Sequence, residues 1–394
     1  MTAGQANTAA PTLRGYRRGD GAFGVRNHVV VMASVACANS IVERIARADP
    51  DVVPVTHQHG CTHMGDDREQ MLRTLAGTCG NPNVGGALIV GLGCENIGAA
   101  DLARRVPADG RVVRTIGIQE IGSADGILAA AATHLREMKD FVAAQRRQPC
   151  GVAGLTVALE CGGSDPFSGI TANPVVGLVS DRLVEMGATA MLSEIPEMIG
   201  TEAVLAGRIP DPEIRRRLFG RIADYVRTVR DQGGDLRGAN PSPGNIRAGL
   251  STIEEKSLGC IIKGGTSDIV ELVRYAERPR RRGLVVMDTP GNDPESVTGM
   301  AAGGAQVVLF TTGVGTPLGS PVCPVIKMAT NSRTYERMAD FMDFNAGRIV
   351  EGETMPQLAD ELFELLVAVC NGRQTAAERN RCREFAVNRI GATL

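Results

Sequence analysis

The sequence contains no tryptophan and few other aromatic residues, with four Tyr and nine Phe among 394 residues. Its core must therefore be built from Ala, Val, Leu and Ile, while 48 glycines are available for tight loops. It also lacks an excess of either charge, because 42 Lys and Arg stand against 44 Asp and Glu, for a formal net charge of −2. This balance gives no reason to expect nucleic acid or an anionic membrane as a partner, so we expect a protein that binds small molecules.

Long hydrophobic runs are also missing. No apolar stretch reaches the roughly 18 residues of a membrane-spanning helix, and the first residues, MTAGQANTAAPTLR, do not have the pattern of a secretory signal. We therefore predict a disordered tail over residues 1–14 and a cytoplasmic location. In that compartment, the ten cysteines are expected to be reduced thiols and metal ligands rather than disulfides.

The chain is too long for one comfortable hydrophobic core, and short β-branched runs alternate with helical segments along it. This alternation predicts two doubly wound α/β domains with mainly parallel sheets, over residues 15–149 and 150–394, and a site in the cleft between them. The predicted strands are residues 29–37, 52–56, 87–93 and 112–118 in the first domain, and 155–161, 189–194, 283–289 and 305–313 in the second. Residues 233–265 form a long Gly- and Pro-rich excursion that predicts a functional or mobile loop.

Reactive side chains follow several of the predicted strands, where parallel sheets bind their ligands. The segment HQHGCTH contains His57, His59, Cys61 and His63. Imidazole and thiolate together suit Fe(II) or Zn(II), although the spacing matches no structural zinc pattern. The alternative is that Cys61 is a small buried turn residue and that some of the histidines are solvated. Cys94, in GLGCENIG, is either a metal ligand or a packing residue.

The segment ECGGSDPFSGITANP, residues 160–174, ends a predicted strand with Glu160 and Cys161 before a helix. Its glycines, hydroxyls and amides predict a nest that binds a carboxylate. The alternative is an ordinary Gly-Ser turn with Asn173 as a helix cap. Lys256 lies within the excursion, where a lysine is either functional or simply solvated.

Several long motifs carry a resemblance to a known family. They are GYRRGDGAFGVRNHVVV, HQHGC, NPNVGGALIVGLGCE, ECGGSDPFSGITANPVVG, SEIPEMIGTE, SPGNIRAGLSTIEEKSLG and PVIKMATN. From about residue 15 to 390, the chain resembles the large catalytic domain of the altronate/galactarate dehydratases. The resemblance implies an iron-dependent lyase acting on sugar acids. A related branch, the large subunit of (2R)-sulfolactate sulfo-lyase, expels sulfite instead of water.

Many members of this family carry a small β-rich domain ahead of the large one, on the same chain or as a separate subunit. The resemblance therefore implies a separate small β-rich subunit as a partner, and a homo-oligomer is the alternative. A small hydroxy-acid is the expected substrate, with no nucleic acid and no membrane as partner.

The expected reaction is dehydration of a sugar acid or other small hydroxy-acid to a 2-oxo acid by α,β-elimination. Such a reaction needs charge stabilisation on the carboxylate, a base, and an acid or Lewis acid at the leaving oxygen. The expected cofactor is Fe²⁺ or an iron-sulfur cluster with one open iron on Cys61, Cys94 and Cys161, and other divalent metals stay open. The alternatives are sulfite elimination and a non-catalytic subunit that binds sugar acids.

These interpretations assign a role to each candidate residue. The predicted catalytic residues are His57, Glu160, Glu194 and Lys256. The predicted metal ligands are Cys61, Cys94, Cys161 and His57. The predicted substrate-binding residues are Arg26, Asn27, Asn39, Ser164, Asp165, Asn173 and Thr312.

Overall fold

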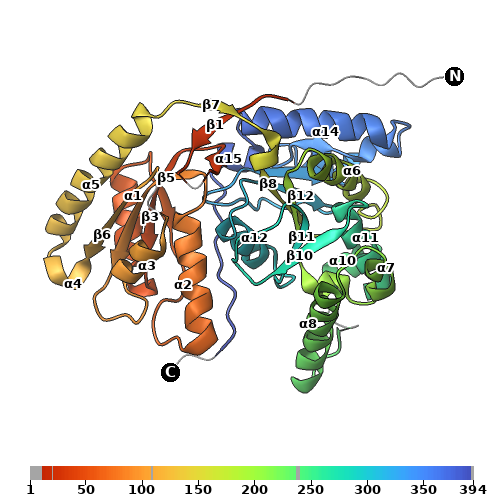
Figure 1. Ribbon diagram of the computed structural model, residues 1–394, viewed down its shortest axis with the longest axis horizontal. Helices are drawn as coiled ribbons and strands as arrows, with labels where there is room; N and C mark the ends of the chain where they lie inside the picture. Colours follow the sequence, from red (N-terminus) through yellow and green to blue (C-terminus); the bar gives the residue numbers. More distant parts are fainter. Residues whose placement is uncertain (1–10, 20, 108–109, 237–239, 392–394) are drawn as a thin grey trace.

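The computed structural model describes residues 11–19, 21–107, 110–236 and 240–391. Two α/β bodies lie side by side, each built around a parallel sheet (Figure 1). The prediction of an α/β fold with mainly parallel sheets is confirmed. Among the described helices, none is both long and apolar enough to cross a membrane.

The first domain holds a four-stranded parallel sheet in the order β4-β3-β5-β6. Its strands are β3 (His28–Ala33), β4 (Val53–Val55), β5 (Val84–Gly91) and β6 (Val112–Gly117). Its helices are α1 (Asn39–Ala48), α2 (Gly65–Cys79), α3 (Ala99–Arg105), α4 (Ile118–Ile121) and α5 (Ala124–Ala144). β5 is buried along its whole length, because α1 and α5 cover one face of the sheet and α2 and α3 the other.

The second domain holds a seven-stranded parallel sheet in the order β10-β11-β9-β8-β12-β13-β14. Its strands are β8 (Thr156–Cys161), β9 (Thr189–Leu192), β10 (Ile269–Val273), β11 (Gly283–Met287), β12 (Val307–Thr312), β13 (Val325–Ala329) and β14 (Phe344–Asn345). Its longer helices are α6 (Ala172–Glu185), α8 (Pro212–Asp231), α12 (Asp293–Ala302) and α14 (Met355–Cys370). Shorter helices are α7 (Glu202–Ala206), α13 (Ser332–Arg337) and α15 (Ala376–Arg379).

A small antiparallel sheet, β2-β1-β7, lies where the chain passes from one domain to the other. It consists of β1 (Leu13–Arg17), β2 (Phe23–Gly24) and β7 (Gln148–Cys150). β1 begins inside the segment predicted as a disordered tail. This part of the prediction is wrong because the side chain of Leu13 is buried in the core of the second domain. Residues 1–10 of the predicted tail lie outside the described residues.

The predicted loop over residues 233–265 is largely helical in its described part. It contains α10 (Pro243–Arg247), α11 (Ile253–Ile261) and the 3-10 turn η4 (Ile262–Gly264). Two caps explain these helices, because the side chain of Ser242 accepts a hydrogen bond from the backbone N–H of Asn245 and that of Thr252 from the N–H of Glu255. The Gly and Pro residues that suggested a loop lie between short helices.

The two domains share one hydrophobic core, in which α2 packs against α12. The chain also returns to the first domain at its C-terminal end, where the carboxylate of Asp67 accepts a hydrogen bond of 2.9 Å from the backbone N–H of Ile390. Gly77 of α2 lies against the backbone of α12, where a Cβ atom would clash with the carbonyl oxygen of Ala302. This close approach fixes the distance between the two domains.

The Gly77→Ala substitution is expected to lower the free energy of unfolding by about 1–3 kcal/mol, because the added methyl group would push α2 and α12 apart. Gly220→Ala is the matched control, since Gly220 lies in the middle of α8 with open space where its Cβ would be. It should raise the free energy by about 0.5–1 kcal/mol, the usual gain for Ala over Gly within a helix. Urea unfolding followed by circular dichroism measures both. Equal effects of the two substitutions would contradict this account of the domain contact.

Candidate active site

The order of strands in the second sheet reverses at β8, because β9 lies on one side of it and β12 on the other. Doubly wound sheets bind ligands beyond the carboxyl ends of the strands at such a point. Cys161 is the last residue of β8, and Glu194 follows β9 by two residues. The topology therefore brings these two side chains to the same edge of the sheet.

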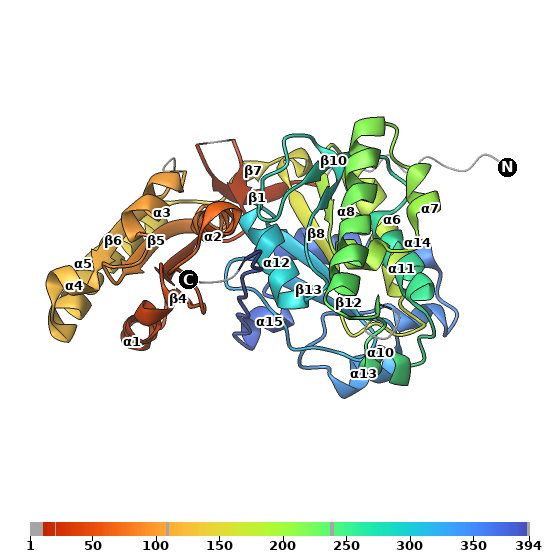
Figure 2. The same ribbon diagram turned by 90° about the horizontal axis from the view of Figure 1, so that it is seen from below.

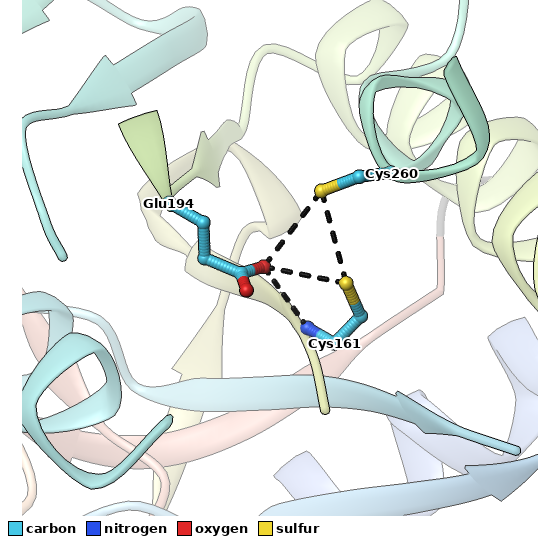
Figure 3. Close-up of side chains that lie close together, drawn as sticks. All are labelled: Cys161, Glu194 and Cys260. Carbon is cyan, nitrogen blue, oxygen red and sulfur yellow. Dashed lines mark hydrogen bonds between the residues drawn. The ribbon is translucent and has the colours of Figure 1, made fainter. Parts of the chain in front are cut away.

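Cys161, Glu194 and Cys260 converge there from three separate elements, the third being α11 (Figure 3). The Glu194 Oε2 atom lies 3.4 Å from the Cys161 sulfur and 3.8 Å from the Cys260 sulfur, and the two sulfurs are 3.7 Å apart. All three residues are buried. We call this set, together with Lys263, Glu160 and Asp293, the acid–thiol cluster.

Lys263 is fully buried, and its Nζ atom donates to Glu194 Oε2 over 2.7 Å. Burial alone would lower the pKa of Lys263, but the surrounding Cys161, Cys260 and Glu194 side chains raise it well above its usual value. The ammonium group therefore stays charged and supplies the positive charge of the acid–thiol cluster. Glu194 itself has a left-handed backbone with φ of 66°, rare for a residue other than glycine and common at functional sites.

Glu160, in β8, is the second buried acid of the cluster. Its Oε2 atom accepts hydrogen bonds of 2.7 Å from the Ser193 and Ser296 hydroxyls, while its Oε1 atom has no partner. Burial, followed by the negative charge of Glu194, raises the pKa of Glu160 well above its usual value. Burial and the charge of Glu194 therefore both favour the protonated form of Glu160.

Asp293, the first residue of α12, is the third acid. Burial and the neighbouring Glu194 raise its pKa to about 7. A side chain on Gly162 would clash with the Asp293 carboxylate, so the glycine after Cys161 allows the acid to approach the strand end. Asp293 is thus the member of the cluster that changes its protonation near neutral pH.

A cavity of about 230 Å³ opens beside the cluster, lined among others by Ser164, Asp165, Asn173, Lys256 and Cys260. It is small, as expected for a site that takes a molecule of a few carbon atoms. A larger hollow of about 310 Å³ lies against Thr156 and Thr189, at the opposite, amino-terminal ends of β8 and β9. Of these two cavities, only the smaller one is lined by a member of the acid–thiol cluster, Cys260.

Lys256 contributes a second charged amine to the lining of the cavity. Its Nζ atom lies 2.7 Å from Glu197 Oε1 and donates to Asn240 Oδ1 over 2.7 Å. Burial lowers the pKa of Lys256, but Glu197 raises it above its usual value. The other Glu197 oxygen is buried without a hydrogen-bond partner. Lys256 can therefore offer its charge to an anion that enters the cavity.

The remaining predicted residues of the second domain support the loops around the cavity. Asp165 accepts hydrogen bonds from the Thr330 hydroxyl and the Asn331 amide. The Asn173 side chain bridges the Thr311 hydroxyl and the carbonyl of Gly259. The backbone carbonyl of Ser164 accepts from Asn245 over 2.9 Å, and the Thr312 hydroxyl accepts from the backbone N–H of Gly315 over 2.9 Å.

His57 and Asn39 lie at the carboxyl edge of the first sheet. The His57 Nε2 atom bonds to the carbonyl of Ala33 over 2.8 Å, and its Nδ1 atom accepts from the backbone N–H of His59 over 3.2 Å. Burial lowers the pKa of His57 to about 4, so the ring is neutral. Because backbone groups occupy both ring nitrogens, neither nitrogen is free in this conformation to bind a metal ion or a proton. Asn39 donates to the carbonyl of His57 over 2.7 Å and holds the same loop.

Arg26 and Asn27 lie at the domain junction rather than at a site. The Arg26 guanidinium uses all five of its donors, on Glu378 and on the backbone carbonyls of Val25, Val369 and Arg373. Asn27 bonds to Arg18, Val142 and Gln145. The described conformation leaves neither residue free for a substrate, so we assign both to the connection between the domains.

The four predicted metal ligands do not form one group. Cys61 and Cys94 are exposed on loops of the first domain, whereas Cys161 is buried in the acid–thiol cluster of the second. Sequence reasoning also missed Cys260 and Asp293. Cys260 lay within a predicted loop, but Asp293 follows a predicted strand and could have been found by the rule that placed Glu194.

The described residues contain two trios whose ligand atoms lie within 4.8 Å of one another, Cys161–Glu194–Cys260 and Glu160–Glu194–Asp293. Both trios share Glu194, which already holds the ammonium group of Lys263. A divalent ion in either trio would lie beside that buried positive charge, which is costly at low dielectric. The acid–thiol cluster therefore suits proton transfer better than metal binding.

Comparison with known proteins assigns both domains to one family. Residues 15–143 match the family model "D-galactarate dehydratase/Altronate hydrolase, second domain", and residues 152–393 match "D-galactarate/Altronate dehydratase, C-terminal". The altronate dehydratase of Bacillus subtilis is 37% identical over 395 residues, which cover 97% of this chain and 78% of that protein. The altronate dehydratase of Escherichia coli is 37% identical over 390 residues, 96% of this chain and 78% of that protein.

A third relative carries a different activity in its name. The (2R)-sulfolactate sulfo-lyase subunit beta of Chromohalobacter salexigens is 35% identical over 382 residues, 96% of this chain and 97% of that protein. The predicted family is confirmed by both family models and by these relatives. The chain belongs to the D-galactarate/altronate dehydratase family and is an enzyme of the hydro-lyase class.

Proposed function

We propose that this enzyme dehydrates a sugar acid to a 2-oxo acid by α,β-elimination at the acid–thiol cluster. The observation that supports this most is a pair of acids held in different environments at one edge of the sheet, next to the cavity that Cys260 lines. Glu194 is ion-paired with Lys263, whereas the pKa of Asp293 is raised to about 7. Two acids whose environments separate their pKa values are the usual arrangement for acid and base roles.

The elimination removes a proton next to the substrate carboxylate and a hydroxide from the neighbouring carbon. Lys256 holds the carboxylate at the cavity by its charge, and the Glu194 carboxylate accepts the proton. Protonated Asp293 gives its proton to the departing hydroxyl, which leaves as water. The enol that results tautomerises to the 2-oxo acid, so that atoms and charges balance over the reaction.

We also infer that the reaction depends on ferrous iron, as the sequence motifs predict. The soft thiol ligands Cys61 and Cys94 support this inference, because both are exposed at the carboxyl edge of the first sheet. Iron would act as a Lewis acid that neutralises charge on the substrate oxygens. Figure 2 shows α1 of the first domain and α10 of the second low in the view, on either side of α15.

Removal of iron is expected to stop turnover. We expect a chelator to abolish formation of 2-oxo acid from altronate or galactarate, and ferrous iron with a reductant to restore it. A panel that includes (2R)-sulfolactate, with separate assays for 2-oxo acid and for sulfite, decides between water and sulfite as the leaving group. Full activity in a metal-free preparation would refute the dependence on iron. Binding of sugar acids without any product would favour the non-catalytic alternative.

The Asp293→Asn substitution is expected to lower kcat by about 10²–10⁴-fold, because an amide cannot donate the proton. In the unmodified enzyme, kcat should fall as the pH rises through about 7, where Asp293 loses its proton, and this limb should be absent from the variant. Glu295→Gln is the matched control, since Glu295 lies in the same first turn of α12 but outside the acid–thiol cluster. A variant that keeps the limb near pH 7 would exclude Asp293 as the acid.

Stability provides an independent readout for Asp293. Its pKa is about 7 in the folded chain, against an ordinary value of 3.8, so the folded protein retains a proton that the unfolded chain loses between these values. The Asp293 side chain therefore leaves the free energy of unfolding unchanged below pH 3.8 and lowers it increasingly as the pH rises to 7. Asp293→Asn should raise the urea midpoint at about pH 8 more than at about pH 4, whatever its effect on turnover.

We further propose that a separate small subunit completes the enzyme. This is supported by the relative named as a subunit beta, of which the alignment covers 97%. The isolated chain is then expected to turn over slowly, and a small β-rich partner to raise its rate. Affinity purification from the native cell, with kinetics before and after removal of any partner, measures this. Undiminished activity of a partner-free preparation would refute the proposal and favour a homo-oligomer.

A further inference from the structure

Two buried thiols of the acid–thiol cluster take no part in the proposed elimination. The sulfurs of Cys161, at the end of β8, and Cys260, in the last turn of α11, lie 3.7 Å apart. All ten cysteines of the chain are free, so this pair is in its reduced form. The two sulfurs would have to approach by roughly 1.7 Å to reach the usual disulfide bond length of about 2.05 Å.

The backbone next to Cys260 is held close to the loop that follows β8. A Cβ atom on Gly259 would come within 3.3 Å of the Gly169 Cα atom, so these two glycines allow a close approach of α11 to that loop. The Asn173 side chain donates to the carbonyl of Gly259 over 2.7 Å and fixes the same contact. The packing of α11 therefore brings the Cys260 sulfur toward that of Cys161 (Figure 3).

The cavity beside the cluster gives a small oxidant access to one of the two thiols. Cys260 lines this cavity of about 230 Å³, whereas Cys161 does not. Hydrogen peroxide is uncharged and much smaller than a sugar acid, so it can enter wherever the proposed substrate can. The contact with Cys161, followed by burial, raises the pKa of Cys260 well above its usual value, so the reactive thiolate is scarce and its oxidation slow. The pair therefore responds to sustained rather than brief exposure.

We propose that Cys161 and Cys260 are a redox-sensitive pair, which peroxide converts into a disulfide that switches the enzyme off. The loss of activity, but not the formation of the disulfide, rests on the proposed function. In reducing compartments, disulfides of this kind are usually transient and sense the redox state.

The oxidation takes two steps. The Cys260 sulfur attacks one peroxide oxygen, the O–O bond breaks, and one water leaves with a sulfenic acid on Cys260. The Cys161 sulfur then attacks the sulfenic sulfur, the S–S bond forms and a second water leaves. Two thiols lose two electrons and two protons in total, and one peroxide becomes two waters. A thiol reductant reverses the change by thiol–disulfide exchange.

The disulfide would change the site in two ways. Both sulfurs lie within hydrogen-bond distance of Glu194 Oε2, at 3.4 Å for Cys161 and 3.8 Å for Cys260. A disulfide has no S–H group, so Glu194 loses these donors. Cys260 and Lys256 are also four residues apart on α11 and share one face of that helix. A shift of Cys260 toward Cys161 therefore also moves the amine that holds the substrate carboxylate in the proposed reaction.

The disulfide is tested on the full chain without substrate. After exposure to hydrogen peroxide and alkylation of the remaining thiols, peptide mass spectrometry without reduction should find Cys161 linked to Cys260. The bond joins residues 99 positions apart and restricts the unfolded chain, so the urea midpoint should rise, and dithiothreitol should return it to its first value. Cys260→Ser should abolish both the linkage and the rise. The half-buried Cys382→Ser is the control and should keep both.

The effect on turnover is measured after peroxide is removed and ferrous iron is supplied afresh. We expect the oxidised enzyme to lose turnover by about 10²-fold, since a misplacement of about 1 Å can cost that much. Dithiothreitol should restore the rate. The Cys260→Ser variant should keep its own untreated rate after the same exposure, whatever that rate is.

Several results would overturn the proposal. They are undiminished turnover of the fully linked chain, thiols of Cys161 and Cys260 that stay open to alkylation after peroxide, and reversible inhibition of Cys260→Ser equal to that of the unmodified chain. Circular dichroism shows whether each variant is folded, and the linkage in the unmodified chain needs no variant. A chain that forms the linkage but turns over no sugar acid when reduced would contradict the proposed function alone. Turnover of sugar acids by a chain that never forms the linkage would contradict the redox pair alone.

Discussion

The arrangement of the second domain depends on the buried ion pair between Lys263 and Glu194. Both side chains are almost completely buried, with exposed fractions of 0% and 2%, and their charged atoms are 2.7 Å apart. Such a pair is held by its geometry and by further hydrogen bonds, because removal of either partner leaves an uncompensated charge at low dielectric. Glu194 receives these further contacts from the backbone N–H of Cys161, at 3.2 Å, and from both thiols. The pair thus ties the ends of β8 and β9 to α11 and η4.

The same ion pair also acts on the pKa values of the acids around it. Burial raises the pKa of Glu160 and Asp293 most, the negative charge of Glu194 raises both further, and the positive charge of Lys263 lowers both. Asp293 is the acid whose pKa of about 7 lies nearest to neutral pH.

How much of the fold and of the site the sequence predicts depends on the kind of signal that each residue gives. Continuous β-branched runs identified the central strands, because strands covered on both faces are apolar throughout. The rule that ligands lie beyond strand ends placed Glu160, Cys161 and Glu194, and it would have placed Asp293 had it been applied after β11. Cys260 was missed because capping by Thr252, rather than hydrophobic periodicity, defines α11. Arg26 and His57 have suitable chemistry, but only the fold shows that backbone and side-chain partners already occupy their polar atoms.

In the proposed reaction, the contacts of Lys256 give a negatively charged substrate a way to enter a site rich in acids. Lys256 is paired with Glu197, whose pKa is raised by burial and by Glu194 although Lys256 lowers it. A carboxylate that binds to Lys256 removes part of the stabilisation of the Glu197 charge, and Glu197 can then take up a proton. One negative charge enters with the substrate, and one is cancelled by that proton, so the net charge of the buried site is unchanged. The buried Glu197 oxygen without a partner is the atom at which this proton can bind. In the proposed reaction, this exchange lets Lys256 keep its full charge for the substrate.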